Sequence, residues 1–181
     1  MDKLETPSAT DEVVIRSAEL KDCEEIVRLI MELAEFENMA DRVTMTAQIL
    51  RNDCFDEKPK CSCVVASKED DQSCLVGYSL FYPVYSTWVG ASLYLEDLYV
   101  TPSYRSRGIG KQLCQKVTQI GLEMGCNRID LTVLDWNKTA KDMYERYGFV
   151  DLTSKEDFHT MRLERGGMEN FVKKSKCKNG I

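Results

Sequence analysis

A turn near the middle of the chain has the residue types of an anion-binding site. An apolar run ending at Val100 leads into a proline turn, then Arg105 and Arg107, and then Gly108-Ile109-Gly110-Lys111 at the start of a helical pattern. The free N–H groups and positive dipole end of a helix N-terminus attract anions. Glycine lets the backbone approach a phosphate without a Cβ in the way. The pattern predicts a loop that holds a pyrophosphate.

Two standard nucleotide motifs do not fit this turn. A Walker loop needs glycine where the chain has Arg105, and serine or threonine where it has Gln112. A dinucleotide-binding fingerprint needs a third small residue, but Leu113 stands there. On this motif alone, an arginine-rich turn with a glycine helix start and no ligand is an equal alternative.

A second motif, in the expected order and spacing, points to one family. The turn resembles the acetyl-CoA pyrophosphate loop of the GNAT family of N-acetyltransferases. Leu134-Asp135-Trp136-Asn137, followed by Tyr144-Glu145-Arg146-Tyr147-Gly148-Phe149, resembles that family's later helix. Glu32-Leu33-Ala34-Glu35-Phe36-Glu37, Tyr85-Ser86-Thr87-Trp88 and Tyr94-Leu95-Glu96-Asp97 resemble its diamine and thialysine branch. The resemblance covers residues 13–163.

The resemblance implies a catalytic pair for acetyl transfer from acetyl-CoA to an amine. A protonated amine, with a pKa near about 10.4, must lose a proton before it can attack the thioester. Glu96 is expected to accept that proton through water, and Tyr144 to donate one to the departing CoA thiolate. Strand alternation predicts that Asp97 points to the opposite face from Glu96. The alternative for Tyr144 is an aromatic side chain that only packs on the inner face of its helix. The alternative for Glu96 is a carboxylate at the surface or in a salt bridge.

The resemblance also implies which residues bind acetyl-CoA. A strand end is expected to pair with the pantetheine arm, the loop to hold the pyrophosphate, and the next helix to continue the groove. These residues are Leu98, Tyr99, Val100, Ser106, Arg107, Gly108, Ile109, Gly110, Lys111, Asn137, Lys138, Thr139 and Ala140. Lys138 and Thr139 depart from the residues usual in the diamine branch.

The expected amine site is acidic, which suits a cationic substrate. It is lined by Phe36, Glu37, Glu96 and Glu156. Diamine acetyltransferases tend to carry an acidic residue where this chain has Ser86, so a thialysine- or lysine-like amine is favoured over spermidine. The family resemblance also implies a homodimer.

Three alternatives stay open. The enzyme could act on diamines or polyamines, or on a lysine-like residue of a protein. A non-catalytic module that binds acyl-CoA or a partner is the third, because fold does not guarantee activity. A cysteine-nucleophile enzyme is disfavoured, since His159 is the only histidine.

The composition further narrows the possible partners, compartment and kind of site. The chain has 181 residues with 24 Lys and Arg against 30 Asp and Glu, a net charge of −6 that disfavours nucleic acid as a partner. No apolar run is long enough for a membrane span, and the polar N-terminus lacks a signal-peptide core, which predicts a cytoplasmic protein. The eight cysteines are expected to be reduced. With no CxxC pair and one histidine, no metal site is expected.

The elements that must position these residues alternate between strand and helix, which predicts an α/β fold. The resemblance implies a GNAT fold, with a mixed, mostly antiparallel sheet of six or seven strands and about four helices. We expect a solvated tail over residues 1–12, the domain over 13–164 and a basic C-terminal tail over 165–181. Caps are expected at Asp22, Thr46, Gly108 and Gly148. Strands are expected at 13–15, 61–67, 74–82, 93–100, 128–134, 149–152 and 158–163.

Overall fold

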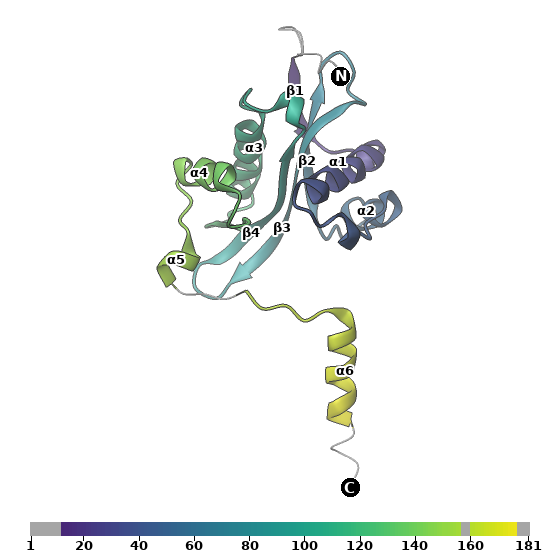
Figure 1. Cartoon of the computed structure of the whole chain (residues 1–181), viewed down its shortest axis with the longest axis vertical. Helices are drawn as coiled ribbons and strands as arrows, with labels where there is room; N and C mark the ends of the chain where they lie inside the picture. The colour runs from purple at the N-terminus through teal and green to yellow at the C-terminus, as the bar shows by residue number, and fades with distance from the viewer. Residues whose placement is uncertain (1–11, 157–159, 177–181) are drawn as a thin grey trace. The chain divides into compact units, whose positions relative to one another are not determined.

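The computed structural model describes residues 12–156 and 160–176, with the backbone alone for residues 173–176. Its contacts divide the chain into two compact units, Met1–Thr132 and Val133–Ile181, which we call the N-terminal and C-terminal units. Figure 1 shows the elements of both units. Each unit is described by itself.

The N-terminal unit is built on one five-stranded sheet with the order β1-β2-β3-β4-β5. The first four strands pair antiparallel, and β5 pairs parallel with β4. The mixed, mostly antiparallel sheet is confirmed, but the expected count of six or seven strands is wrong. The strands are β1 Val13–Ser17, β2 Ser62–Lys68, β3 Leu75–Ser86, β4 Gly90–Val100 and β5 Ile129–Leu131.

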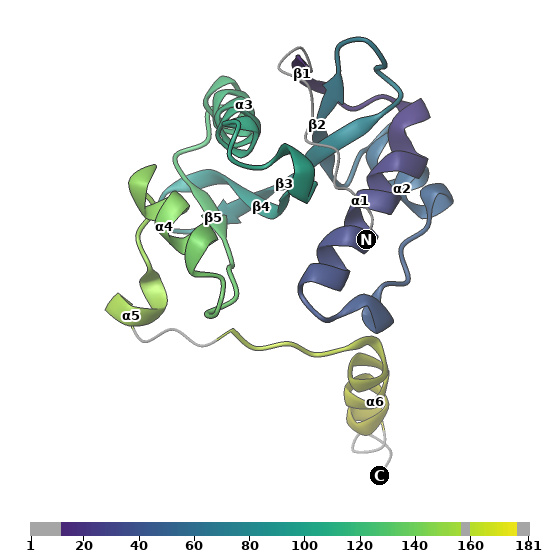
Figure 2. The same cartoon turned by 45° about the horizontal axis from the view of Figure 1, so that its top comes forward.

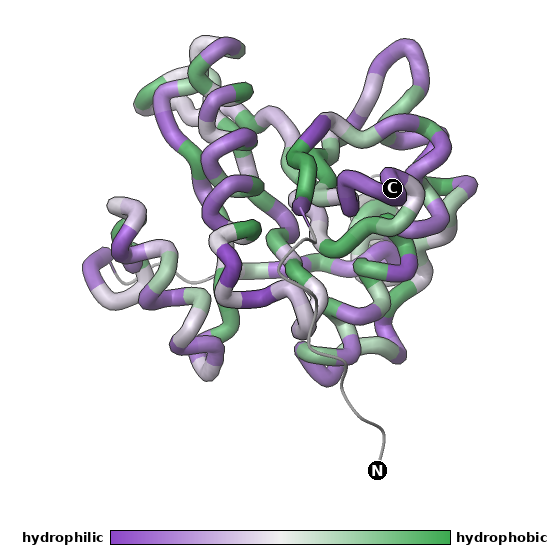
Figure 3. The backbone as a smooth tube through the Cα atoms, turned by 90° about the horizontal axis from the view of Figure 1, so that it is seen from above, coloured by the Kyte–Doolittle hydropathy of each residue, from purple (hydrophilic) through white to green (hydrophobic). Residues whose placement is uncertain are grey.

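Helices cover both faces of this sheet. Figure 2 shows α1 (Cys23–Phe36) and α2 (Ala47–Cys54) on one face and α3 (Ile109–Glu123) on the other. Apolar residues recur along each helix at helical spacing. In Figure 3, hydrophobic and hydrophilic residues are mixed along the backbone. Burial of these apolar stripes stabilises the unit. The core under α1 and α2 contains Cys23, Ile26, Leu29, Leu50, Cys63, Val65, Leu75, Tyr78 and Tyr99.

Two predicted helix starts have different outcomes. The Thr46 hydroxyl accepts a hydrogen bond from the Ile49 N–H (3.2 Å) and caps α2, as predicted. Asp22 occupies the N-cap position of α1, as predicted, but its carboxylate makes no cap bond to that helix. Asp22 is buried and instead accepts from the Arg16 guanidinium (2.6 Å) and from the Glu19 N–H (2.7 Å). A buried carboxylate requires a cation, and β1 supplies one.

The N-terminal unit also contains short 3-10 helices at Leu20–Asp22, Ala40–Arg42 and Pro102–Tyr104. The last of these lies between β4 and α3, in the turn predicted to bind pyrophosphate. Proline at its first position has no N–H to leave unpaired there.

The described part of the C-terminal unit is helical. It contains α4 (Lys138–Arg146), α5 (Leu152–Glu156) and α6 (Arg165–Lys176), so the described residues form six α-helices rather than about four. The expected strands at 149–152 and 158–163 are wrong for the described residues, and residues 157–159 lie outside them. Asp151 accepts hydrogen bonds from the Thr153 and Ser154 N–H groups and so starts α5.

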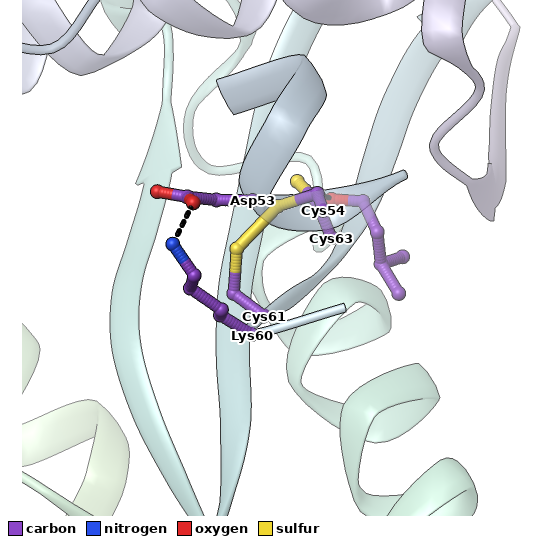
Figure 4. The surroundings of a disulfide bond; sticks show 6 residues. Asp53, Cys54, Lys60, Cys61 and Cys63 are labelled. Carbon is purple, nitrogen blue, oxygen red and sulfur yellow. Dashed lines mark hydrogen bonds and ion pairs between the residues drawn. A yellow bond between two sulfur atoms is a disulfide. The ribbon is translucent and has the colours of Figure 1, made fainter. Parts of the chain in front are cut away.

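One disulfide corrects the expectation of reduced cysteines. Cys54, the last residue of α2, is bonded to Cys61, just before β2. Figure 4 shows the bond beside an ion pair between Asp53 and Lys60. The bond ties the end of α2 to the start of the adjacent strand. The free cysteines are Cys23, Cys63, Cys74, Cys114 and Cys126, and Cys177 lies outside the described residues.

The described residues contain neither a metal-ligand cluster nor a membrane-spanning helix. Within residues 12–156 and 160–176, no cluster of three or more His, Cys, Asp or Glu side chains could hold a metal ion. None of the helices described above is long and apolar enough to cross a membrane.

Candidate active site

Strand β4 carries a β-bulge at Glu96. Opposite it on β3, Phe81 pairs with Leu95 and Leu80 pairs with Asp97, so Glu96 has no partner in the ladder. An extra residue of this kind breaks the up-and-down alternation of side chains and bends the strand.

The bulge brings two adjacent carboxylates to one face of the sheet. The Tyr82 hydroxyl donates to Glu96 Oε2 (3.0 Å), and the Tyr78 hydroxyl donates to Asp97 Oδ2 (2.9 Å). Tyr78 and Tyr82 are four residues apart on β3 and therefore share a face. The prediction that Asp97 points away from the face of Glu96 is wrong, because regular alternation does not hold across the bulge.

A third carboxylate adds to this negative cluster from the end of α1. Burial raises the pKa of Glu37. Burial also raises the pKa of Asp97 to about 6, against the Tyr78 hydrogen bond, and the charges of Glu96 and Glu37 raise it further. Burial and nearby like charges both disfavour the ionised form of a carboxylate. A cation bound beside the carboxylates lowers the free-energy cost of both effects. We call Glu37, Glu96 and Asp97 the acidic cluster.

The edge of β4 away from β3 is open beyond Leu95. Among the described strands, β5 pairs only with Leu93, Tyr94 and Leu95 of β4. The Thr101 N–H donates to Val76 O on β3 (2.9 Å), so by alternation the main-chain groups of Leu98 and Val100 face the open edge. An extended ligand can pair with them there.

Tyr99, between these two residues, is placed differently. Its side chain is buried in the core and its main chain faces β3 by the same alternation. The Val100 carbonyl accepts from Arg105 Nε (2.8 Å). The Leu98 and Val100 amides are therefore the donors that this edge can offer a ligand.

The loop after β4 ends in an exposed helix N-terminus. Ser106 and Gly108 have positive φ, +62° and +79°, and Gly108 is the N-cap of α3. The Gln112 N–H donates to the Gly108 carbonyl (3.0 Å), and no side chain caps the helix. The N–H groups of Ile109, Gly110 and Lys111 thus have no helical acceptor and can bind an anion.

Arg105 ties this loop to the end of α1. Its guanidinium lies over the rings of Phe36 (4.9 Å) and Tyr99 (5.4 Å). Arg107 lies over the ring of Tyr104 (4.8 Å). The N-terminal unit therefore brings Phe36, which was predicted to line the amine site, next to the loop predicted to bind the cofactor.

The Tyr-x-x-x-Gly-Phe motif of the C-terminal unit forms the C-terminal end of α4. The Phe149 N–H donates to Tyr144 O (3.1 Å) and the Gly148 N–H to Glu145 O (3.0 Å), with Gly148 at φ +94°. The rings of Tyr144 and Phe149 meet edge-on at 5.4 Å. This contact holds the ring of Tyr144 at the last turn of α4.

The other predicted residues of this unit lie at helix ends. Asn137 Oδ1 accepts from the Ala140 N–H (3.2 Å) and caps α4, so Lys138, Thr139 and Ala140 form its first turn. Glu156 is exposed at the end of α5.

Sequence reasoning missed three residues of the carboxylate-bearing face: Tyr78, Tyr82 and Asp97. The two tyrosines are spaced as one face of a strand, and that spacing is the only signal the sequence carries for them.

Comparison with known proteins shows the family of this chain. A sequence model described as the Acetyltransferase (GNAT) family matches residues 23–149. The chain belongs to the GNAT family. The predicted family and the N-acetyltransferase class are thereby confirmed.

Several relatives of this GNAT enzyme are known. The thialysine N-epsilon-acetyltransferase of Sus scrofa is 45% identical, over 90% of this chain and 98% of its own. That of Mus musculus is 44% identical, over 87% and 96%. The human spermidine/spermine N(1)-acetyltransferase-like protein 1 is 39% identical over 87% of this chain but only 23% of its own.

Solved structures share the GNAT fold at low sequence identity. An integron cassette protein from V. cholerae has a TM-score of 0.70 at 23% identity, covering 89% of this chain and 98% of its own. An aminoglycoside acetyltransferase from an uncultured soil metagenomic sample has a TM-score of 0.68 at 18% identity, covering 86% and 100%. The predicted α/β GNAT fold is confirmed, apart from its strand and helix counts.

Proposed function

We propose that this enzyme transfers the acetyl group of acetyl-CoA to the side-chain amine of thialysine or of a similar lysine-like cation. The acidic cluster carries the proposal, because three carboxylates held near one another favour a cationic ligand. The relatives named thialysine N-epsilon-acetyltransferase support the same substrate class.

Glu96 removes the proton from the bound ammonium through a water molecule. The amine needs its lone pair to attack the thioester, so a base must act before or during that attack. Glu96 lies exposed on the bulge of β4, whereas Asp97 is more deeply buried beside it. The exposed carboxylate has access to water, and Asp97 and Glu37 add to the local negative potential.

The open edge of β4 and the start of α3 fit acetyl-CoA. The Leu98 and Val100 amides pair with the extended pantetheine arm, and an amide donor there stabilises the oxyanion as the thioester carbonyl is attacked. The N–H groups of Ile109, Gly110 and Lys111 hold the pyrophosphate. The acetyl carbon leaves sulfur for nitrogen in one direct transfer.

Tyr144 donates a proton to the CoA thiolate as it leaves. The Gly148 turn and the Phe149 ring hold its side chain at the end of α4. A hydroxyl fixed in this way can act as a general acid without a large cost in conformational entropy.

Ser86 supports a lysine-like substrate over a polyamine. Its Oγ accepts hydrogen bonds from the Trp88 and Val89 N–H groups (3.2 and 3.3 Å), in the turn between β3 and β4. Ser86 is uncharged, and its hydroxyl oxygen stabilises the turn. It therefore offers no carboxylate to the second, distant ammonium group of a polyamine. Polyamine acetylation is the second candidate, supported by the 39% identical human relative.

Release of CoA with a panel of amines tests the proposal. Thialysine, lysine, spermidine, spermine and putrescine are compared under one set of conditions. We expect the highest kcat/KM with thialysine. Comparable kcat/KM for spermidine would favour the polyamine reading, and no CoA release with any amine would favour a non-catalytic acyl-CoA-binding module.

We further propose that the enzyme is a homodimer. Tyr85 and Trp88, near the tip of the β3–β4 hairpin, are 80% and 81% exposed, and large exposed aromatic residues favour a protein contact. Sedimentation of the wild type and of Trp88→Ala tests this, with dissociation expected for the variant and a monomeric wild type contradicting it.

A further inference from the structure

The bulge that exposes Glu96 also removes the usual constraint on its side chain. In a regular strand, cross-strand neighbours on the same face hold a side chain in place. Glu96 has no residue opposite it on β3. Its carboxylate is exposed, and the hydrogen bond that the structure gives it comes from the Tyr82 hydroxyl, at 3.0 Å from Oε2.

Tyr82 is itself held by a chain of contacts across the sheet. Its ring stacks on Tyr94 of β4, with ring centroids 5.5 Å apart and an interplanar angle of 27°. The Tyr94 hydroxyl donates to Thr132 Oγ1 (3.2 Å), just after β5. The stack with the Tyr94 ring, which does not need the Tyr94 hydroxyl, therefore holds the ring that binds Glu96.

The chemistry of Tyr82 suits a permanent hydrogen-bond donor. Burial raises its pKa to about 12, and the hydrogen bond to Glu96 raises it in the same direction. The hydroxyl stays protonated over the range in which such an enzyme works. Tyr78, on the same face of β3, cannot replace it because its hydroxyl donates to Asp97.

We propose that Tyr82 is a positioning residue, which holds Glu96 in the orientation that receives the proton of the amine. Tyr82 takes Oε2, which leaves Oε1 for the water that carries the proton. A freely rotating carboxylate on a bulge would spend only part of its time in that orientation, and small errors in position are costly in catalysis. This inference rests on the proposed function, in which Glu96 is the base.

The test compares Tyr82→Phe with Tyr94→Phe. Each variant keeps an aromatic ring in the stack and loses one hydroxyl hydrogen bond, but only Tyr82→Phe releases Glu96. We expect kcat with the preferred amine to fall about tenfold in Tyr82→Phe, equivalent to about 1.4 kcal/mol. The KM for acetyl-CoA should not change, and Tyr94→Phe should keep kcat within about twofold of the wild type.

A double-variant cycle then shows whether the effect passes through Glu96. If Tyr82 acts by holding that carboxylate, adding Tyr82→Phe to Glu96→Gln should lower kcat by less than about twofold further. Circular dichroism melting of all four proteins sets an assay temperature at which each is folded. A tenfold loss that persists in the Glu96→Gln background would indicate a structural role and overturn the inference.

The outcomes separate this inference from the function on which it rests. An impaired Glu96→Gln together with a Tyr82→Phe variant as active as Tyr94→Phe refutes the positioning role alone. A Glu96→Gln variant with wild-type kcat refutes Glu96 as the base, and both proposals about this residue then fail.

Discussion

Replacing Asp97 with asparagine should stabilise the fold while weakening the site. The pKa of Asp97 is raised from 3.8 to about 6, chiefly by burial. A raised carboxylate pKa means that the folded state loses this proton less readily than the unfolded chain does. The group therefore costs the fold no stability below pH 3.8, and its cost grows as pH rises through the interval up to about 6.

The magnitude follows from this difference of about two pKa units. At 1.36 kcal/mol per unit, ionised Asp97 costs about 3 kcal/mol of unfolding free energy at pH 7 and about half of that at pH 5. Asparagine carries no charge, and its Oδ1 can still accept the Tyr78 hydrogen bond. An unpartnered amide N–H₂ group offsets part of the gain, so we expect about 1–2 kcal/mol at pH 7.

Urea denaturation of wild type and Asp97→Asn at pH 7 and pH 5 measures this effect. The cost of the amide group is the same at both pH values, so the gain should be about 1 kcal/mol smaller at pH 5 and close to zero. Asp70→Asn, which changes an exposed carboxylate in the β2–β3 turn, is the control and should leave stability within about 0.5 kcal/mol. A less stable Asp97→Asn at pH 7, or a gain that does not shrink at pH 5, would refute the reasoning.

The remaining predictions concern Tyr144, the proposed general acid, and the disulfide. Tyr144→Phe should lower kcat at least about 100-fold with little change in the KM for acetyl-CoA, because only the proton donor is lost. Tyr147→Phe, at the C-cap of the same helix, is the control, and a Tyr144→Phe variant as active as Tyr147→Phe would remove Tyr144 from the mechanism. Changing Cys54 and Cys61 to serine should lower the free energy of unfolding by about 2.5 kcal/mol, since the bond closes a loop of eight residues. In chemical denaturation, a Cys74→Ser variant should match the wild type, and a double variant as stable as the wild type would show that the bond contributes nothing.

Local motifs could be predicted from the sequence where the interaction joins residues that are close in the chain. Thr46 caps α2 through an N–H three residues ahead, and Gly108 begins α3 with a positive φ that other residues rarely adopt. Gly148 ends α4 for the same conformational reason. Asp151 was missed because the β-branched and aromatic residues around it favour a strand, and a local cap outweighed them.

Contacts that depend on how separate elements pack could not be predicted in the same way. Asp22 looked like a helix cap, but its carboxylate is buried against Arg16 on β1. The cysteine count alone could not show that Cys54 and Cys61 lie close enough to bond, since that depends on how α2 meets β2.

By itself, the sequence determined the family, the glycine start of α3 and the helix end that holds Tyr144. These depend on short-range hydrogen bonds and on the backbone freedom of glycine. Only the tertiary structure decided which way Glu96 and Asp97 point. One extra residue in the pairing of β4 with β3 turns both carboxylates to a single face, and β3 supplies a tyrosine to each. A bulge is a property of two paired strands, so the sequence of either strand alone cannot reveal it.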